Sequence, residues 1–200
     1  MLSDEDIYQR YLTKQHEFEK AADVTLIGHS LFDMWDDEPQ GTPLLAGQTV
    51  ANMGISGVSA RQYLDVIVKP QHITALGKYV FIFLGVNDIV KEPAYSPKQV
   101  LAWIVDIQRR LQKIAPHSRY FLLEATPINP QCVTVDNPTI DCLNQYLQAN
   151  VPSDLNFIAT KSAFVDENGA LAQDLTRDGL HFTAKGYTVL QQLLEQQLSH

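Results

Sequence analysis

Short apolar runs alternate with longer amphipathic stretches along most of the chain. The run at 78–85, KYVFIFLG, is continuous and apolar, which is typical of a strand buried between two layers of helices. The run at 24–28, VTLIG, is rich in aliphatic and β-branched residues and precedes a turn. This pattern predicts strands at residues 24–28, 49–54, 78–85, 119–126 and 156–160, with 78–85 as the central strand.

Helices are predicted between these strands, most clearly where a capping residue precedes an amphipathic stretch. Ser3, Ser59 and Ser96 are suitable N-caps, and Pro97 occupies the first helical position after Ser96. The predicted helices cover residues 4–21, 59–68, 97–114, 139–150 and 183–198. Strands that alternate with helices predict an α/β fold with a parallel sheet, helices on both faces and right-handed crossovers. We expect residues 1–200 to form a single domain, with the N-terminal helix (1–22) packed on or beside it.

Composition and charge narrow the classes of partner. The 200 residues are 45% hydrophobic and carry a formal net charge of −8. Because the basic residues form no run or stripe, we expect a small neutral substrate and neither nucleic acid nor an anionic membrane surface. The acidic N-terminal segment lacks the apolar core of a signal peptide, and no stretch is long enough to span a bilayer. A cytoplasmic protein is therefore expected, in which Cys132 and Cys142 stay reduced and have structural roles.

Ser30 lies just after the first predicted strand, in the sequence GHSLF. Open α/β sheets build their sites at this end of the strands. The sequence nearly matches the G-x-S-x-G turn of the α/β-hydrolases, although Phe32 replaces the second glycine. That fold places several strands before its nucleophile, whereas only one is predicted before Ser30. The position of Ser30 therefore argues against the α/β-hydrolase fold.

A serine hydroxyl needs a general base, a group that orients the base, and donors for the oxyanion. In the segment RDGLHFTAKGY, Asp178 lies three residues before His181. A compact turn would bring the carboxylate to the Nδ1 side of the imidazole and leave Nε2 facing Ser30. For this pair alone, the alternative is a loop in which Asp178 caps a turn and His181 is solvated.

Oxyanion donors are available in two further loops that follow predicted strands, ANMGISGVSA and FLGVNDI. The backbone N–H of Gly57 could join that of Ser30, and the side-chain amide of Asn87 could add a third donor. Taken singly, Gly57 is more typical of a turn and Asn87 of a polar loop end. These loops become informative only together with the Asp-His pair.

Four blocks, IGHSLFDMW, NMGISG, GVND and DGLHFTAKGY, resemble the SGNH/GDSL hydrolase family of esterases and lipases in this order. The resemblance covers most of the chain and implies a flavodoxin-like, three-layer α/β/α domain with a mostly parallel five-stranded sheet and no metal or organic cofactor. It implies that Ser30 is the nucleophile and a backbone oxyanion donor, that Gly57 and Asn87 are the other donors, and that His181 is the general base oriented by Asp178. The N-x-G-x-x-G form of NMGISG is most similar to the platelet-activating-factor acetylhydrolase branch.

The chain departs from the family pattern at one position. The family's Gly-Asp-Ser is Gly-His-Ser here, with His29 where the aspartate would be. An imidazole could make one hydrogen bond to a neighbouring amide but would lack the carboxylate's charge, which changes the local electrostatics. An alternative role for His29 is that of a second base for Ser30.

These features predict a serine esterase that hydrolyses small-molecule carboxylic esters through an acyl-enzyme, with short acyl chains because no long hydrophobic flap is evident. The alternatives are an acyltransferase or carbohydrate O-acetyl esterase with the same site, and a catalytically silent module that binds a small ligand or a protein. His29, Trp35, Tyr95 and Ile128 are candidates for the substrate pocket. The acidic helix at 4–20 either covers the sheet or forms a partner surface, which leaves a homo-oligomer open.

Overall fold

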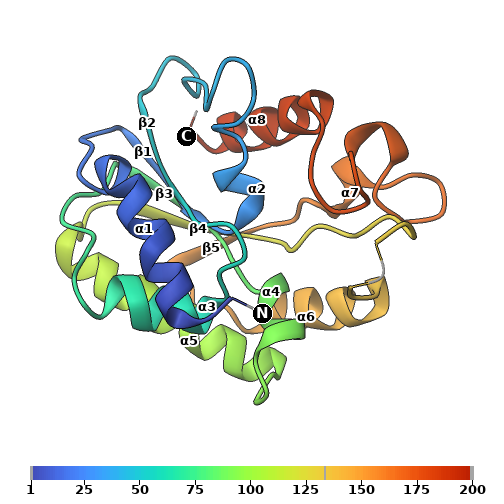
Figure 1. The fold of residues 1–200 in the computed structure, drawn as a ribbon, viewed down its shortest axis with the longest axis horizontal. Coiled ribbons are helices and arrows are strands. Elements are labelled where there is room, and N and C mark those ends of the chain that lie inside the picture. The colour runs from blue at the N-terminus through green and yellow to red at the C-terminus, as the bar shows by residue number, and fades with distance from the viewer. Residues whose placement is uncertain (1, 133, 199–200) are drawn as a thin grey trace.

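A computed structural model describes residues 2–132 and 134–198. These residues contain a five-stranded sheet in which every neighbouring pair of strands is parallel and the strand order is β2-β1-β3-β4-β5 (Figure 1). The strands are β1 (Val24–Gly28), β2 (Val50–Gly54), β3 (Tyr79–Phe83), β4 (Arg119–Leu123) and β5 (Leu155–Ile158). This order is the flavodoxin-like one, and β3 is central as predicted.

The helices follow the predicted capping signals closely. They are α1 (Asp4–Phe18), α2 (Ser30–Asp33), α3 (Ala60–Gln62), η1 (Tyr63–Val68), α4 (Val86–Lys91), α5 (Pro97–Ile114), α6 (Asn137–Asn150), α7 (Lys161–Phe164), η2 (Gln173–Leu175) and α8 (Ala184–Leu198). The side chains of Ser3, Ser59 and Ser96 each accept a backbone N–H in the first helical turn. The predicted helices therefore begin where their caps are.

Other helix boundaries differ from the sequence prediction. The short helices α2, α4 and α7 lie in segments where no helix was predicted, because four to six residues are too few to show an apolar periodicity. α6 begins two residues before the predicted start, since Asp136 caps it. The predicted helix at 59–68 is α-helical only in its first turn, and residues 63–68 form a π-helix.

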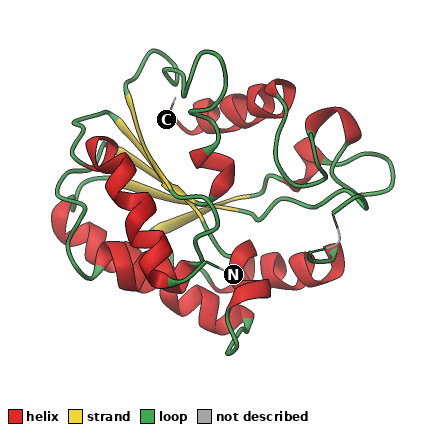
Figure 2. Cartoon of the chain, viewed as in Figure 1, coloured by secondary structure: helices red, strands yellow, loops and turns green. Residues whose placement is uncertain are grey.

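Successive residues of the strands enter two separate cores, one on each face of the sheet. On one face, Val80 and Ile82 pack with side chains from α1, α3, η1, α5 and α6. On the other face, Phe81 and Phe83 pack with side chains from α2, α7 and α8. Figure 2 shows the strands between these two groups of helices. The three-layer α/β/α architecture is therefore confirmed.

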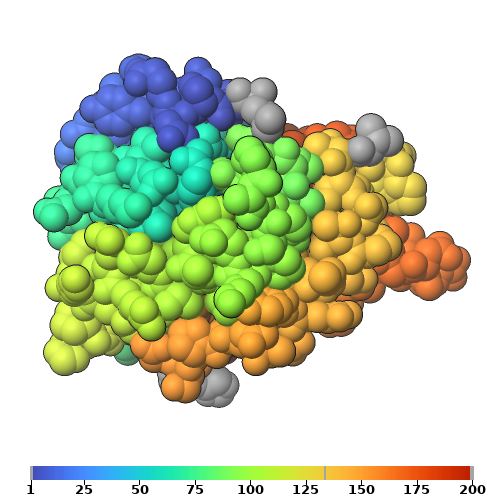
Figure 3. All heavy atoms as spheres, turned by 90° about the horizontal axis from the view of Figure 1, so that it is seen from below, coloured from blue at the N-terminus to red at the C-terminus, as the bar shows by residue number. Residues whose placement is uncertain are grey.

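The N-terminal helix α1 covers part of the sheet. Its residues Ile7, Tyr11 and Phe18 are buried in the same core as β2 and η1. In the view from below, the N-terminal residues lie along the segment that follows residue 55 (Figure 3). Thus the apolar stripe of α1 is packed, while the acidic residues of its first turn, Asp4, Glu5 and Asp6, are exposed.

Among residues 2–132 and 134–198, no helix combines the length and the apolar character needed to cross a membrane.

Candidate active site

Ser30 lies where β1 turns into the short helix α2, at the carboxyl end of the sheet. A Cβ placed on Gly28 would lie 2.8 Å from both the backbone oxygen of Phe83 and the ring of Phe32, so only glycine fits at this close approach. The tight turn makes Ser30 the first residue of α2, and 8% of its surface is exposed. The serine is therefore accessible from a backbone position held by β1 and β3.

The side chains of Ser30, His181 and Asp178 form a continuous hydrogen-bonded chain. His181 Nε2 lies 3.1 Å from Ser30 Oγ, although the two residues are 151 positions apart. His181 Nδ1 lies 2.6 Å from Asp178 Oδ2. Because a carboxylate only accepts hydrogen bonds, Nδ1 carries the ring hydrogen and donates it to Asp178, and Nε2 is left free to accept the proton of the serine. The geometry meets the requirements for a nucleophile, its base and the group that orients the base.

The turn from Asp178 to His181 also fixes the other carboxylate oxygen. Asp178 Oδ1 accepts hydrogen bonds from the backbone N–H groups of Leu180 at 2.9 Å and His181 at 2.7 Å. Burial raises the pKa of the Asp178 carboxyl, but hydrogen bonds from the His181 ring and these two N–H groups outweigh it and hold the pKa below its usual value. The compact turn predicted from the three-residue spacing is therefore present, and its carboxylate is charged at neutral pH.

Three N–H donors lie in the loops that were predicted to supply them. Asn87 is on the short helix α4, and its side-chain amide donates to the Val58 carbonyl at 3.0 Å, which leaves its second hydrogen available. Within the described part of the chain, the backbone N–H groups of Ser30 and Gly57 have no acceptor. Gly57 has φ +77°, a conformation that favours glycine. The three groups are thus donors with unused hydrogen-bonding capacity.

Helix α4 holds the loop that carries Gly57. Asp88 is fully buried, and its two carboxylate oxygens accept the Ala60 backbone N–H at 2.8 and 3.0 Å. Lys91 donates to the Gly57 carbonyl. Burial raises the pKa of Asp88 to about 7, against the opposing effect of the backbone N–H groups. Asn87 and the 57–60 loop are therefore positioned by the same helix.

His29 has a capping role beside Ser30. It is the N-cap of α2, and its Nδ1 accepts the Leu31 backbone N–H at 3.3 Å. Only 2% of its surface is exposed, and burial, followed by the nearby His181, lowers its pKa to about 3. His29 is consequently neutral with its proton on Nε2, and its Nδ1 lone pair is already used. This arrangement argues against His29 as a second base for Ser30.

A small hollow of about 30 Å³ opens beside the serine. Its lining combines polar groups of the site with aliphatic side chains: His29, Ser30, Val86, Asn87, Val90, Thr134, Val135 and Leu180. Sequence reasoning missed the aliphatic residues of this hollow. Their positions in the sequence give a signal that could have found them. Val86 and Val90 lie on either side of Asn87 and are four residues apart, and Leu180 directly precedes His181.

Of the predicted pocket residues, only His29 lines this hollow. Trp35 is stacked on Tyr187, with ring centroids 5.3 Å apart, in the core beneath α8. Tyr95 packs against the core on the α5 side of the sheet. Ile128 is buried behind the hollow, in a cluster with Val86. Trp35 and Ile128 are buried core residues and Tyr95 is partly buried against the core, which their sequence neighbours do not reveal.

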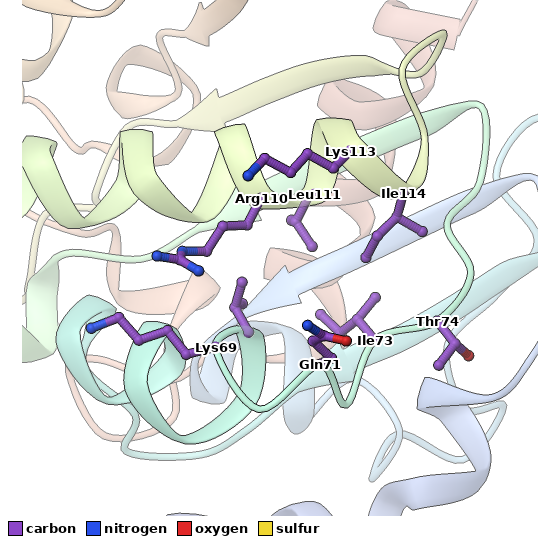
Figure 4. Close-up of a pocket in the computed structure, with 9 residues that line it drawn as sticks. Lys69, Gln71, Ile73, Thr74, Arg110, Leu111, Lys113 and Ile114 are labelled. Carbon is purple, nitrogen blue, oxygen red and sulfur yellow. The ribbon is translucent and has the colours of Figure 1, made fainter.

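A larger hollow of about 430 Å³ lies between η1 and α5, away from Ser30 (Figure 4). It is lined by residues that precede β3 and β4, and therefore lies toward the amino ends of the strands. Lys69 and Arg110 in its wall are each paired with a carboxylate four residues earlier. In the described ranges, no group of three or more His, Cys, Asp or Glu side chains is arranged to hold a metal ion.

Comparison with known proteins identifies the family and the fold. The model of the GDSL-like lipase/acylhydrolase family matches residues 26–189. A protein from Streptococcus pneumoniae named as a platelet activating factor has a similar structure, with a TM-score of 0.77 and 22% identity over 96% of this chain and 94% of that one. A Bacteroides fragilis protein named as an acylhydrolase has a TM-score of 0.70 and 26% identity, covering 95% of this chain and 94% of its own.

A longer relative also matches the chain. It is an N-acylneuraminate cytidylyltransferase from Escherichia coli, 35% identical over 187 residues, which are 94% of this chain and 43% of the relative. The match covers 43% of this relative and 32% of an N-acylneuraminate cytidylyltransferase from Streptococcus agalactiae. The chain therefore spans less than half the length of the curated relatives it matches.

Proposed function

The chain belongs to the GDSL-like lipase/acylhydrolase family, and we propose that it is a serine esterase that hydrolyses short-chain carboxylic esters through an acyl-enzyme. The observation that carries this proposal is the hydrogen-bonded chain from Ser30 Oγ through His181 to Asp178. The three residues come from the two ends of the sequence, and their contact has no evident purpose in packing. Such a chain is what converts a weakly nucleophilic hydroxyl into an effective one.

In the first step, Ser30 Oγ attacks the ester carbonyl while His181 Nε2 takes the hydroxyl proton. The charge that develops on the carbonyl oxygen is stabilised by the N–H groups of Ser30 and Gly57 and by the Asn87 amide. The carboxylate of Asp178 stabilises the imidazolium that forms. His181 then gives its proton to the leaving alcohol as the C–O bond breaks, and the acyl group remains on Ser30.

The second step repeats the first with water as the nucleophile. His181 accepts a proton from water as the water oxygen attacks the acyl carbon, and the same three donors hold the oxyanion. Collapse of the intermediate breaks the bond to Ser30 Oγ, which recovers its proton from His181. The free acid leaves, and the site returns to its starting protonation state.

The hollow beside Ser30 supports a short acyl group. Its volume of about 30 Å³ leaves room for a small group beside the serine. Val86, Val90, Val135 and Leu180 make its wall apolar, which suits a methyl group better than a charged one. An acetyl ester therefore fits this proposal best.

A second candidate is an O-acetyl esterase that acts on sugars. The specific observation in its favour is the 35% identical relative, whose name gives N-acylneuraminate, an acylated sugar acid, as its substrate. Esters of a sugar hydroxyl would use the same acyl-enzyme, and the hollow described above would hold only the acetyl group. The two candidates differ in the alcohol part of the ester and share one mechanism.

The test is a series of p-nitrophenyl esters from acetyl to palmitoyl, with the purified protein and its Ser30→Ala variant measured side by side. We expect hydrolysis that is fastest with acetate and is lost in Ser30→Ala. O-acetylated neuraminic acid, compared with p-nitrophenyl acetate, then separates the two candidates by kcat/KM. If wild type and Ser30→Ala have the same rate while both are folded, the esterase proposal is wrong.

Two further measurements separate the remaining alternatives. An added acceptor alcohol diverts the acyl group into a new ester if the protein is an acyltransferase, and product analysis detects this. A fluorophosphonate labels a serine only when that serine is activated, so labelling of wild type and not of Ser30→Ala excludes a catalytically silent module. Absence of labelling on the folded protein would favour the silent module.

A further inference from the structure

The residue before Gly57 is held on both sides by charged groups. The Ser56 backbone N–H donates to Asp33 Oδ2 at 2.7 Å. The Ser56 carbonyl accepts a hydrogen bond from Arg10 Nη1 at 3.3 Å. Asp33 lies three residues after Ser30 on α2, and Arg10 comes from the N-terminal helix α1. The two helices on either side of β1 therefore converge on one residue of this loop.

A second residue of α1 supports the same arrangement. Lys14 Nζ lies 2.8 Å from Asp33 Oδ1 and 2.9 Å from Asp36 Oδ2. Burial disfavours its charge, but the two carboxylates outweigh this and raise the pKa of Lys14. Because Arg10 and Lys14 are four residues apart, they lie on one face of α1. That face contacts the loop directly through Arg10 and indirectly through Asp33.

The contact at Ser56 has a direct consequence for Gly57. The Ser56 carbonyl and the Gly57 N–H belong to one planar trans peptide unit, so fixing the direction of the C=O fixes the direction of the N–H. A cation on the carbonyl oxygen also polarises the peptide unit and strengthens its N–H as a donor. Gly57 itself packs closely, since a Cβ on it would lie 2.7 Å from Leu2 Cδ1. Gly57 is thus confined by Leu2, just before α1, and the same Cβ would lie 3.6 Å from Lys91 Nζ of α4.

We propose that Arg10 is a positioning residue of the oxyanion hole, which orients and polarises the Gly57 N–H through the Ser56 carbonyl. This inference rests on the proposed function. It makes α1 part of the catalytic apparatus, although the match to the family model begins only at residue 26. Arg10 does not touch the substrate, and its effect passes through one peptide unit. Asp33, which is paired with Lys14, holds the preceding peptide unit through the Ser56 N–H.

The effect of losing Arg10 is smaller than that of losing a donor. Removal of one oxyanion donor costs about 10²–10³ in kcat, whereas polarisation changes the strength of a hydrogen bond by about 10–30%. Arg10 is exposed, so its contribution is also screened by solvent. We expect kcat of Arg10→Gln to fall about fivefold with KM unchanged, because the donor is weakened only toward the transition state.

The experiment compares Arg10→Gln, Arg10→Lys and the control Arg110→Gln. Arg110 is likewise an arginine with an exposed side chain, but it lies on α5, where it pairs with Asp106 at 3.0 Å. For each variant, kcat and KM on p-nitrophenyl acetate, the melting temperature, and the ¹H and ¹⁵N shifts of the Gly57 amide are measured. Arg10→Gln should lower kcat and move the Gly57 amide proton upfield, Arg10→Lys should restore part of both effects, and Arg110→Gln should change neither.

Two results would overturn the inference. One is a kcat of Arg10→Gln equal to that of Arg110→Gln, and the other is a Gly57 amide resonance that does not move. If the wild-type protein shows no Ser30-dependent hydrolysis, the proposed function fails, and the Gly57 resonance alone then decides whether Arg10 polarises this peptide unit. The two failures are therefore distinguishable.

Discussion

Replacing Asp178 with asparagine changes a single atom type in the proposed triad. Because Asp178 Oδ1 is held by the backbone N–H groups of Leu180 and His181, the oxygen of an asparagine must stay at that position. Its NH₂ group then faces His181 Nδ1, where the carboxylate oxygen lies 2.6 Å away in the native chain. An NH₂ group donates, so Nδ1 becomes an acceptor and the ring proton moves to Nε2. Ser30 is left facing an N–H group instead of a base.

The magnitude follows from this change of tautomer. In Ser-His-Asp hydrolases, the corresponding substitution lowers kcat by about 10⁴ while the geometry stays intact. At 1.36 kcal/mol for each factor of ten, this is a loss of about 5 kcal/mol of transition-state stabilisation. The Asp178 side chain is 49% exposed, so we expect the melting temperature to change little. A large kinetic effect with a small thermal effect is the signature of an orienting role.

The assay is hydrolysis of p-nitrophenyl acetate near neutral pH together with thermal unfolding. Asp174→Asn is the matched control, since Asp174 lies in the same segment and pairs with Lys185 at the surface. We expect the control to keep wild-type turnover. The reasoning is refuted if kcat of Asp178→Asn stays within about tenfold of wild type, far from the expected loss. A melting temperature well below that of the control would instead assign Asp178 a structural role.

Three further predictions follow from the site. Asn87→Ala removes a proposed oxyanion donor and the 3.0 Å hydrogen bond to the Val58 carbonyl. We expect kcat to fall by about 10²–10³ in a folded protein, and full turnover would exclude Asn87 from the oxyanion hole. Val90→Ala widens the hollow, so kcat/KM for p-nitrophenyl butyrate should rise relative to kcat/KM for p-nitrophenyl acetate. If this ratio does not change, Val90 does not limit the length of the acyl group. In the folded chain the pKa of Asp88 is raised from its ordinary value of 3.8 to about 7. Between these two pH values the unfolded chain loses this proton while the folded chain keeps it, so the free energy of unfolding falls as the pH rises. The melting temperature of wild type, measured from pH 4 to 8, should therefore decline relative to Asp88→Asn over this range, and parallel curves would contradict the raised pKa.

Local signals in the sequence located most of the architecture. The apolar run at Val24–Gly28 coincides with β1, and the Ser96-Pro97 pair marks the start of α5. Caps, prolines and strand propensities act over a few residues, so their effects are readable without a fold. Short helices such as Val86–Lys91 escaped prediction because a single turn carries too little periodicity.

Residues of the hollow were harder to predict than the residues of the triad. Trp35, Tyr95 and Ile128 are large apolar side chains in loops, and such side chains are equally suited to a pocket and to the core. Only packing decides between the two, and it placed Trp35 and Ile128 in core clusters and Tyr95 against one. The polar members of the site were easier to recognise because their chemistry restricts which residue types can serve.

By itself, the sequence determined the alternation of strands and helices, the turn that presents Ser30, and the three-residue spacing of Asp178 and His181, because each depends on neighbours along the chain. The tertiary structure decided that His181 lies 3.1 Å from Ser30 across 151 residues, that α1 reaches the Ser56 carbonyl through Arg10, and that His29 is a buried, neutral cap. These contacts require the strand order β2-β1-β3-β4-β5. That order brings the carboxyl ends of distant strands to one edge of the sheet, and only packing of the two cores fixes which side chains meet there.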